Sequence, residues 1–226
     1  MSLNIIARPL VATLLGLLGL LAVPAAGSSP APPADAYETI VLQSHEFLVY
    51  HPDLRFRGLG MQARERGRHE EARNDFRNAA RYGDKLSQAA LADMLWNGQG
   101  GPVDRALGYA WMDLAAERGT EWLVVQRERF WEALSADERE RAVREGRALY
   151  AEFGDPAATP RLERELRAGS MRQTGSRAGW NGAMRSQGRG DAGARVLQPE
   201  KHQLARYWDP VAYRQWQDEE LARSGR

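Results

Sequence analysis

The chain has 226 residues, 43% hydrophobic and 27% charged, a composition typical of soluble globular proteins with one or two domains. Its 31 basic and 30 acidic residues give a formal net charge of +1, so the chain as a whole is neither a uniformly basic nucleic-acid coat nor an acidic solvating tail. The absence of cysteine excludes a disulfide framework, a thiolate zinc site, a catalytic cysteine and a lipid-anchored cysteine.

The N-terminal segment has the features of a secretory signal. Arg8 precedes an apolar run over residues 10–23, which is shorter than the roughly 20 residues that a membrane-spanning helix needs. Small residues follow it, so we expect cleavage after Ala25 or Ala26. Only Lys85 and Lys201 among the basic residues are lysine, a usage typical of GC-rich bacterial genomes. The sequence therefore predicts a signal peptide over 1–26, a flexible leader over 27–34 and a periplasmic or secreted protein, with membrane contact through the signal peptide alone.

Helical spacing of apolar residues predicts an all-α domain over residues 35–168. No stretch alternates apolar and polar residues, so strands are not expected. Gly67, Gly83 and Gly119 are placed to end helices, and the run 98–102 (Gly-Gln-Gly-Gly-Pro) predicts a loop. The expected helices run over about 35–51, 53–66, 68–82, 85–97, 104–118, 121–133, 135–153 and 161–168.

The composition changes after Gly169. Five arginines, seven glycines and no Val, Leu or Ile before Val196 predict a disordered Arg/Gly-rich linker over 169–198. Asp209-Pro210 is a favourable helix start, and Tyr213, Trp216 and Leu221 lie near one face of the helix it would begin. The sequence thus predicts a C-terminal amphipathic helix within 199–226. Three alternatives stay open, in which this helix docks on the rest of the chain, binds a partner, or is a frayed tail that docks on nothing.

An internal repeat indicates how the helices stack. Phe76-x-x-Ala79-Ala80-x-x-Gly83 recurs 36 residues later as Met112-x-x-Ala115-Ala116-x-x-Gly119. Two small side chains allow a neighbouring helix to approach closely, and the glycine supplies the left-handed conformation that ends the helix. Helix pairs of this kind cannot cover their own apolar face, so we expect them to stack on one another.

The region 85–119 resembles a Sel-one-like repeat, a branch of the tetratricopeptide-like repeats. The resemblance rests on nine residues, expected to be structural: Leu91, Ala92, Gly98, Gly100, Asp104, Trp111, Ala115, Ala116 and Gly119. A weaker copy covers about 54–83, and helices over 121–153 would extend the array. The resemblance implies a short α-solenoid with a concave, protein-binding face. Secreted members that bridge each repeat with a disulfide form a subgroup to which this cysteine-free chain does not belong.

No catalytic, cofactor-binding or metal-binding constellation is found. His45-Glu46 would need a second histidine where Val49 stands, and the other histidines, including His51, have no ligand-like spacing. The glycines of 98–102 lack the Lys and Ser/Thr of a phosphate-binding loop, and no Gly-x-Ser-x-Gly occurs. The chain is therefore predicted to be neither an enzyme nor a nucleic-acid-binding protein.

Aromatic residues are the candidate partner contacts, because Trp and Tyr are favoured anchors of interfaces. They are Tyr109, Trp96, Trp122 and Trp216. We expect a scaffold of the cell envelope that binds an unidentified envelope protein or peptide in a groove lined by helices 53–66, 85–97 and 121–133. Two alternatives stay open, a tether that binds anionic polymer or lipid through arginines of 170–195, and a hydrolase.

Overall fold

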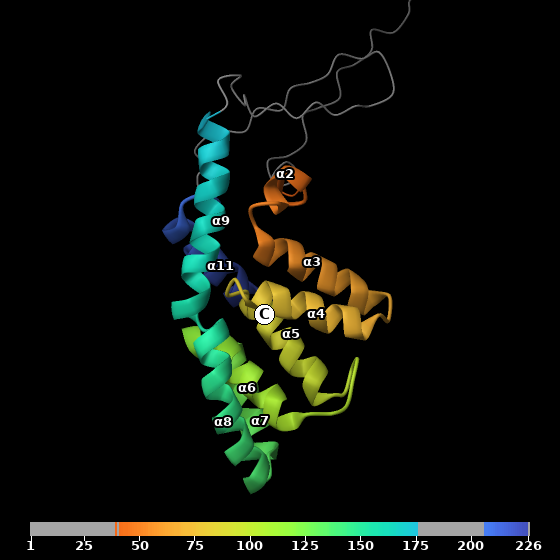
Figure 1. Cartoon of the computed structure of the whole chain (residues 1–226). Coiled ribbons are helices and arrows are strands. Elements are labelled where there is room, and N and C mark those ends of the chain that lie inside the picture. The colour runs from red at the N-terminus through yellow and green to blue at the C-terminus, as the bar shows by residue number, and fades with distance from the viewer. Residues whose placement is uncertain (1–38, 40, 176–205, 226) are drawn as a thin grey trace, which may run out of the picture. The chain divides into compact units, whose positions relative to one another are not determined.

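A computed structural model describes residue 39, residues 41–175 and residues 206–225, with side chains omitted at 173–175. The predicted signal peptide, the leader and the linker residues 176–198 lie outside the described residues. The described residues belong to one structural unit, Ala34–Arg226. They are predominantly helical and contain no strand, so the all-α prediction is confirmed for this part of the chain (Figure 1). No described helix is long and apolar enough to cross a membrane.

The helices pack mainly against their neighbours in sequence. The structure contains α3 (Pro52–Glu65), α4 (His69–Ala80), α5 (Lys85–Trp96), α6 (Arg105–Ala115), α7 (Glu121–Ala133) and α8 (Ala136–Phe153). Helix α3 lies along α4, and α5 along α6. The α4–α5 contact joins these two pairs, while α7 and α8 both pack on α6 (Figure 1).

Local side chains set several of these helix boundaries. The carboxylates of Asp84 and Asp104 accept hydrogen bonds from the backbone N–H groups of Ser87 and Leu107, which caps α5 and α6. Ser135 and Glu138 form a complete capping box at the start of α8. The predicted bounds of these helices therefore agree with the structure to within a few residues.

The repeated motif has matching surroundings in both copies. Its apolar members, Phe76, Ala79, Ala80, Met112, Ala115 and Ala116, are all buried. Gly83 and Gly119 have φ of 80° and 72°, the left-handed conformation expected after each helix. A short 3-10 turn, η1 (Ala116–Arg118), joins α6 to Gly119. Trp111, which the resemblance placed among the structural residues, is fully buried in the same core.

The glycine-rich loop between α5 and α6 packs on the start of α4. Gly98 and Gly100 have φ of 69° and 81°. A Cβ at Gly100 would lie 2.6 Å from the carbonyl carbon of His69, so this position requires glycine for space as well as for conformation. The loop is thus explained by contacts between neighbouring helix pairs.

The first expected helix is interrupted, which corrects the prediction of one helix over 35–51. Residues 39, 41 and 42 are helical, and a separate short helix, α2 (His45–Leu48), then begins. The Ser44 hydroxyl accepts a hydrogen bond from the N–H of Phe47 and donates one to the carbonyl oxygen of Val41. Ser44 therefore caps a new helix where the apolar spacing suggested a continuous one.

The helix expected over 161–168 is much longer, and part of the predicted linker belongs to it. Helix α9 spans Asp155–Gly175, so residues 169–175 are helical and their assignment to a disordered linker was wrong. Leu162 and Leu166 are buried against the C-terminal segment. Gly169 lies inside the helix and does not end it. At this position Tyr50 and Trp208 approach the helix backbone closely. Tertiary packing overrides the weak local pattern here.

The predicted C-terminal helix is present as α11 (Pro210–Ser224). Asp209 caps it by accepting hydrogen bonds from the N–H groups of Val211 and Ala212, and Pro210 occupies its first turn. Tyr213, Trp216 and Leu221 are buried. This helix is docked on the rest of the chain, which the sequence left undecided.

Candidate functional site

Helix α11 lies on a surface built from several separate elements, which we call the α11 docking surface. Its polar members belong to the start of α3, η1, the start of α7 and the start of α9: His51, Asp53, Arg118, Trp122, Asp155 and Thr159. Two of the helices expected to line the groove, α3 and α7, contribute directly. The third, α5, contributes Asp84, Lys85 and Leu86 to a pocket beside α11.

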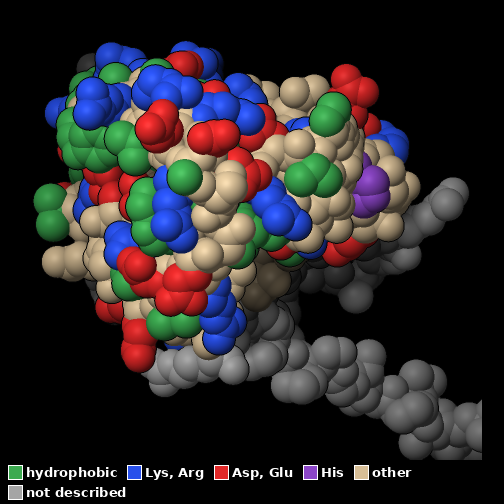
Figure 2. All heavy atoms as spheres, turned by 90° about the horizontal axis from the view of Figure 1, so that it is seen from below, with side chains coloured by type: hydrophobic (Ala, Val, Ile, Leu, Met, Phe, Trp, Pro, Cys, Tyr) green, Lys and Arg blue, Asp and Glu red, His purple; other side chains and the backbone are tan. Residues whose placement is uncertain are grey.

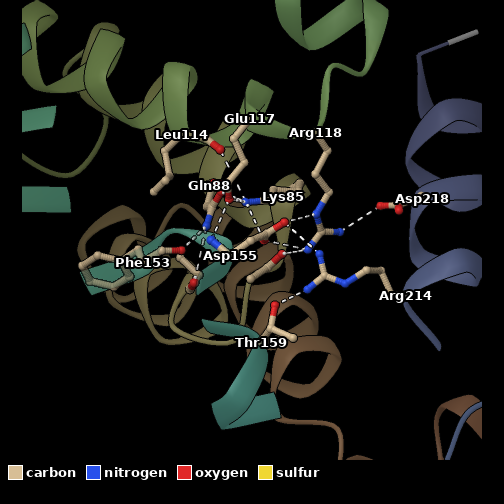
Figure 3. Close-up of polar contacts among 12 residues, drawn as sticks. Lys85, Gln88, Leu114, Glu117, Arg118, Phe153, Asp155, Thr159, Arg214 and Asp218 are labelled. Carbon is tan, nitrogen blue, oxygen red and sulfur yellow. Dashed lines mark hydrogen bonds and ion pairs between the residues drawn. The ribbon is translucent and has the colours of Figure 1, made fainter. Parts of the chain in front are cut away.

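A buried cluster of charges lies at one end of this surface, where α5, η1 and α9 begin (Figure 3). The ammonium group of Lys85 contacts the carboxylate of Glu117, lies 3.2 Å from an oxygen of Asp155, and donates to Gln88 at 3.1 Å. Glu117 also accepts a hydrogen bond from the backbone N–H of Asp155 at 3.0 Å. These contacts fix the start of α9 against α5 and η1.

Arginines extend the cluster to α11. Arg118 donates two hydrogen bonds to Asp155, at 2.8 and 3.0 Å, and another to Asp218 of α11 at 2.9 Å. Arg214 of α11 reaches in the opposite direction, donating to Asp155 at 2.8 Å and contacting the hydroxyl of Thr159 (Figure 3). Asp155 is therefore shared by three cations from three different elements.

The surroundings lower the pKa of Asp155 and Lys85 and raise that of Glu117. Burial disfavours the charge of Asp155, but the hydrogen bonds from Arg118 and the charge of Lys85 hold the pKa of Asp155 well below its usual range. Burial lowers the pKa of Lys85, an effect that the charge of Asp155 opposes. Burial raises the pKa of Glu117. Because each carboxylate has charged or backbone donors, the cluster fits a structural role in holding α9 and α11.

The other end of the docking surface is aromatic. His51 lies under the segment before α11, with Nδ1 2.8 Å from the carbonyl oxygen of Phe47 and Nε2 2.9 Å from that of Tyr207. Its ring stacks on the ring of Phe47, with centroids 3.6 Å apart. Trp208 and Tyr213 approach the same imidazole edge-on. Burial lowers the pKa of His51 to about 4, although both carbonyl groups favour its protonated form.

Asp53 lies at the start of α3 and binds two side chains of α11. Its Oδ2 atom accepts hydrogen bonds from the hydroxyl of Tyr213 and the amide of Gln217, both at 2.7 Å. Its Oδ1 atom is buried with no hydrogen-bond partner. Burial raises the pKa of Asp53 to about 6, against a lowering by the Tyr213 hydrogen bond.

The four aromatic residues predicted to bind a partner differ in their surroundings. Trp216 is buried beside Tyr207 and Tyr213, and Trp122 donates a hydrogen bond to the carbonyl oxygen of Leu221 at 3.0 Å. Both therefore make the α11 interface within this chain. Trp96 and Tyr109 are half-buried at another place, where Trp96 stacks on Phe130 and Tyr109 packs on Trp131.

Sequence reasoning missed the polar residues of the docking surface. Lys85, Asp53, Arg118 and Asp155 have no recognisable motif, and His51 was set aside for lack of metal-ligand spacing. Asp53 and Asp155 each lie beside a proline at the start of a helix, a signal that finds helix starts but not their partners. In the part of the chain that the structure describes, no group of three His, Asp or Glu side chains is placed to hold a metal ion.

No protein-family model, curated protein or solved structure matches this chain. Aromatic side chains, paired charges and hydrogen bonds from several elements converge on α11.

Proposed function

We propose that the protein is a non-enzymatic scaffold of the bacterial cell envelope, a short α-solenoid that binds a protein or peptide partner. The observation that carries the proposal is the α11 docking surface, because elements from α3 to α9 together hold one helix through apolar, hydrogen-bonding and charged contacts. A surface that binds a helix of its own chain has the anchors that a partner helix requires. The matched helix pairs α3–α4 and α5–α6 support the repeat architecture.

The distribution of charge on the outer surface favours recognition of a partner through a few specific side chains. On the face seen in Figure 2, acidic and basic side chains lie side by side, and neither sign covers a broad continuous area. A mixed surface gives weak long-range attraction to polyanions. We therefore favour a protein partner over an anionic polymer bound by the described residues.

The test is capture of a partner in the cell envelope of the source bacterium. The tagged full chain is compared with a Trp216→Ala/Leu221→Ala variant, in which α11 is loosened, after mild crosslinking of intact cells. We expect a specific envelope protein in both samples, with more captured by the loosened variant. Val211→Ala is the matched control in the same helix, because Val211 is 67% exposed.

Two results would reject the scaffold proposal. One is recovery of no specific protein by any of the three chains, with all three folded. The other is a hydrolytic activity of the purified protein that one acidic-to-amide change abolishes. Binding that disappears between low and high salt would instead support the tether, since contacts with polyanions depend steeply on salt.

A further inference from the structure

Helix α11 packs on the start of α9, and the segment that joins the two in sequence, residues 176–205, lies outside the described residues. Its contacts with the docking surface combine buried apolar side chains with polar and charged ones. Tyr213, Trp216 and Leu221 are buried, and Gln217 and Asp218 make polar contacts. The face that is bound thus has a defined spacing: an aromatic residue, a second aromatic three residues later, an aspartate five later and a leucine eight later.

The charges of the two sides are complementary. Asp218 meets Arg118 at 2.9 Å, and Arg214 meets Asp155 at 2.8 Å. Each side therefore supplies one acid and one base, so the contact fixes both the direction and the register of the bound helix. Crossed charge pairs of this kind discriminate between partners more than they add affinity.

The fit is incomplete in two places. A pocket remains between α11 and the start of α5, lined by residues that include Arg57, Lys85, Arg118, Trp216 and Glu220. Close by, the Oδ1 atom of Asp53 is buried without a partner, and burial raises the pKa of this carboxyl group. A buried carboxylate oxygen without a hydrogen bond costs free energy. In the docked state α11 thus leaves this pocket unfilled and does not hydrogen-bond the Oδ1 atom of Asp53.

From these contacts we infer that the α11 docking surface is an exchangeable recognition site for a partner's helix that presents the same spaced face as α11. The occupant is a helical segment of another protein. Counted from a first Tyr or Trp, it carries an arginine one position later, a second Tyr or Trp three positions later, an aspartate five later and a leucine eight later. A larger residue at the position of Glu220, which lines the remaining pocket, would extend into it. This inference rests on the proposed function, since it names the chemistry of the partner.

The experiment uses the full chain carrying Trp216→Ala/Leu221→Ala, which weakens its own α11 but leaves the docking surface intact. A fluorescent peptide with the native sequence of residues 206–225 is titrated onto it, and anisotropy is measured. We expect saturable binding, and at least about tenfold weaker binding to the native full chain, where α11 competes at high effective concentration. No binding to the folded variant would overturn the inference.

Peptide variants test the recognised face. Trp216→Ala in the peptide removes a buried anchor and should weaken binding by about tenfold or more. Asp218→Asn removes the partner of Arg118 and should weaken it by about threefold. The matched control is Glu219→Gln, which removes a neighbouring carboxylate from the exposed side of α11 and should leave affinity within about twofold. Equal affinities for all four peptides would contradict recognition by this face.

A second form keeps the experiment decisive if the double variant does not fold. A protease site inserted between Arg189 and Gly190 allows the native chain to be cut after folding. The bound C-terminal fragment should then exchange with labelled peptide; a fragment that never exchanges would overturn the inference. Formation of a dimer of the chain instead of peptide exchange would assign the surface to a second copy, which also contradicts it.

The two proposals fail in different ways. Peptide binding with no envelope protein captured would leave the recognition site standing and reject the scaffold function. Capture of an envelope protein by a chain that does not bind the peptide would support the scaffold and reject this surface as its binding site.

Discussion

At the scale of single residues, glycine has two separate uses in this chain. Gly83 and Gly119 end helices because their backbones are left-handed. Gly169 lies inside α9 and serves close packing, since a Cβ there would lie 2.7 Å from the Cγ atom of Tyr50 and would also meet the ring of Trp208. The two aromatic rings occupy the space that a side chain at position 169 would need.

Gly169→Ala should therefore destabilise the protein despite the better helix propensity of alanine. We expect a loss of about 1–3 kcal/mol in the free energy of unfolding, because the rings must shift to admit the methyl group. The matched control is Gly58→Ala, also inside a helix, where a Cβ would meet no atom within 4 Å. It should be neutral or add up to about 1 kcal/mol. Urea unfolding of both variants checks this, and equal behaviour would contradict the packing role of Gly169.

At the scale of helices, pairs of alanines set the distance between neighbours. Ala115 and Ala116 are buried where α6 passes into η1, as Ala79 and Ala80 are at the end of α4. Neighbouring helices approach closely at these alanines, and in a packed core the space between them does not admit a larger side chain. The repeat was detected in the sequence by these same positions, so they connect the pattern with the packing.

Ala115→Leu and Ala116→Leu should each overpack the core and lower the free energy of unfolding by roughly 1–3 kcal/mol. Ala133→Leu is the matched control, because Ala133 is exposed at the end of α7. Thermal melting followed by circular dichroism measures all three. If the two core variants melt like the parent, the close helix approach inferred from the repeat is wrong.

Removal of residues 199–226 should destabilise the remaining helices, because Leu221 belongs to the main core and Trp122 loses its acceptor. We expect a loss on the order of 2–5 kcal/mol in the free energy of unfolding, since several buried side chains are lost while fewer residues need to be ordered. Trp216→Ala should lower the melting temperature in the same direction, and Val211→Ala, at an exposed position, should not. An unchanged melting temperature after deletion would contradict docking.

The sequence predicted those helices whose bounds are set by neighbouring residues, and it missed features that depend on contacts between distant parts of the chain. Caps such as Asp104 and Ser135 act within one turn, so the bounds of α6 and α8 were predictable. The extent of α9 depends on burial of Leu162 and Leu166 by the C-terminal segment, which no local pattern reveals. The docking surface depends on contacts such as Tyr213 with Asp53, which lie 160 residues apart. Its apolar anchors were visible in the sequence, but its charged partners were not.

At the scale of the whole molecule, two buried titratable groups hold the same C-terminal segment and respond oppositely to pH. Burial lowers the pKa of His51 to about 4, so its contribution to stability is lost as pH falls from about 6.5 to 4. Burial raises the pKa of Asp53 to about 6, so its contribution is greatest at low pH and is lost as pH rises from about 4 to 6. Arg57, Asp84 and Tyr213 are the charged and titratable groups that act on Asp53.

Between pH 4 and pH 6.5 the two contributions oppose each other, each on the order of 3 kcal/mol for a shift of roughly two pKa units. Asp53→Asn removes one of them, so the stability of this variant relative to the parent should fall by about that amount as pH is lowered from 6.5 to 4. His51→Gln removes the other, so its relative stability should rise over the same interval. Urea unfolding at several pH values measures both differences, in which all other titrating groups cancel. Parallel pH profiles for the parent and both variants would show that folding shifts neither pKa, and slopes of the same sign would contradict the opposition. Opposite slopes would show that one acid and one base, both buried against the C-terminal segment, offset each other's pH dependence in the parent.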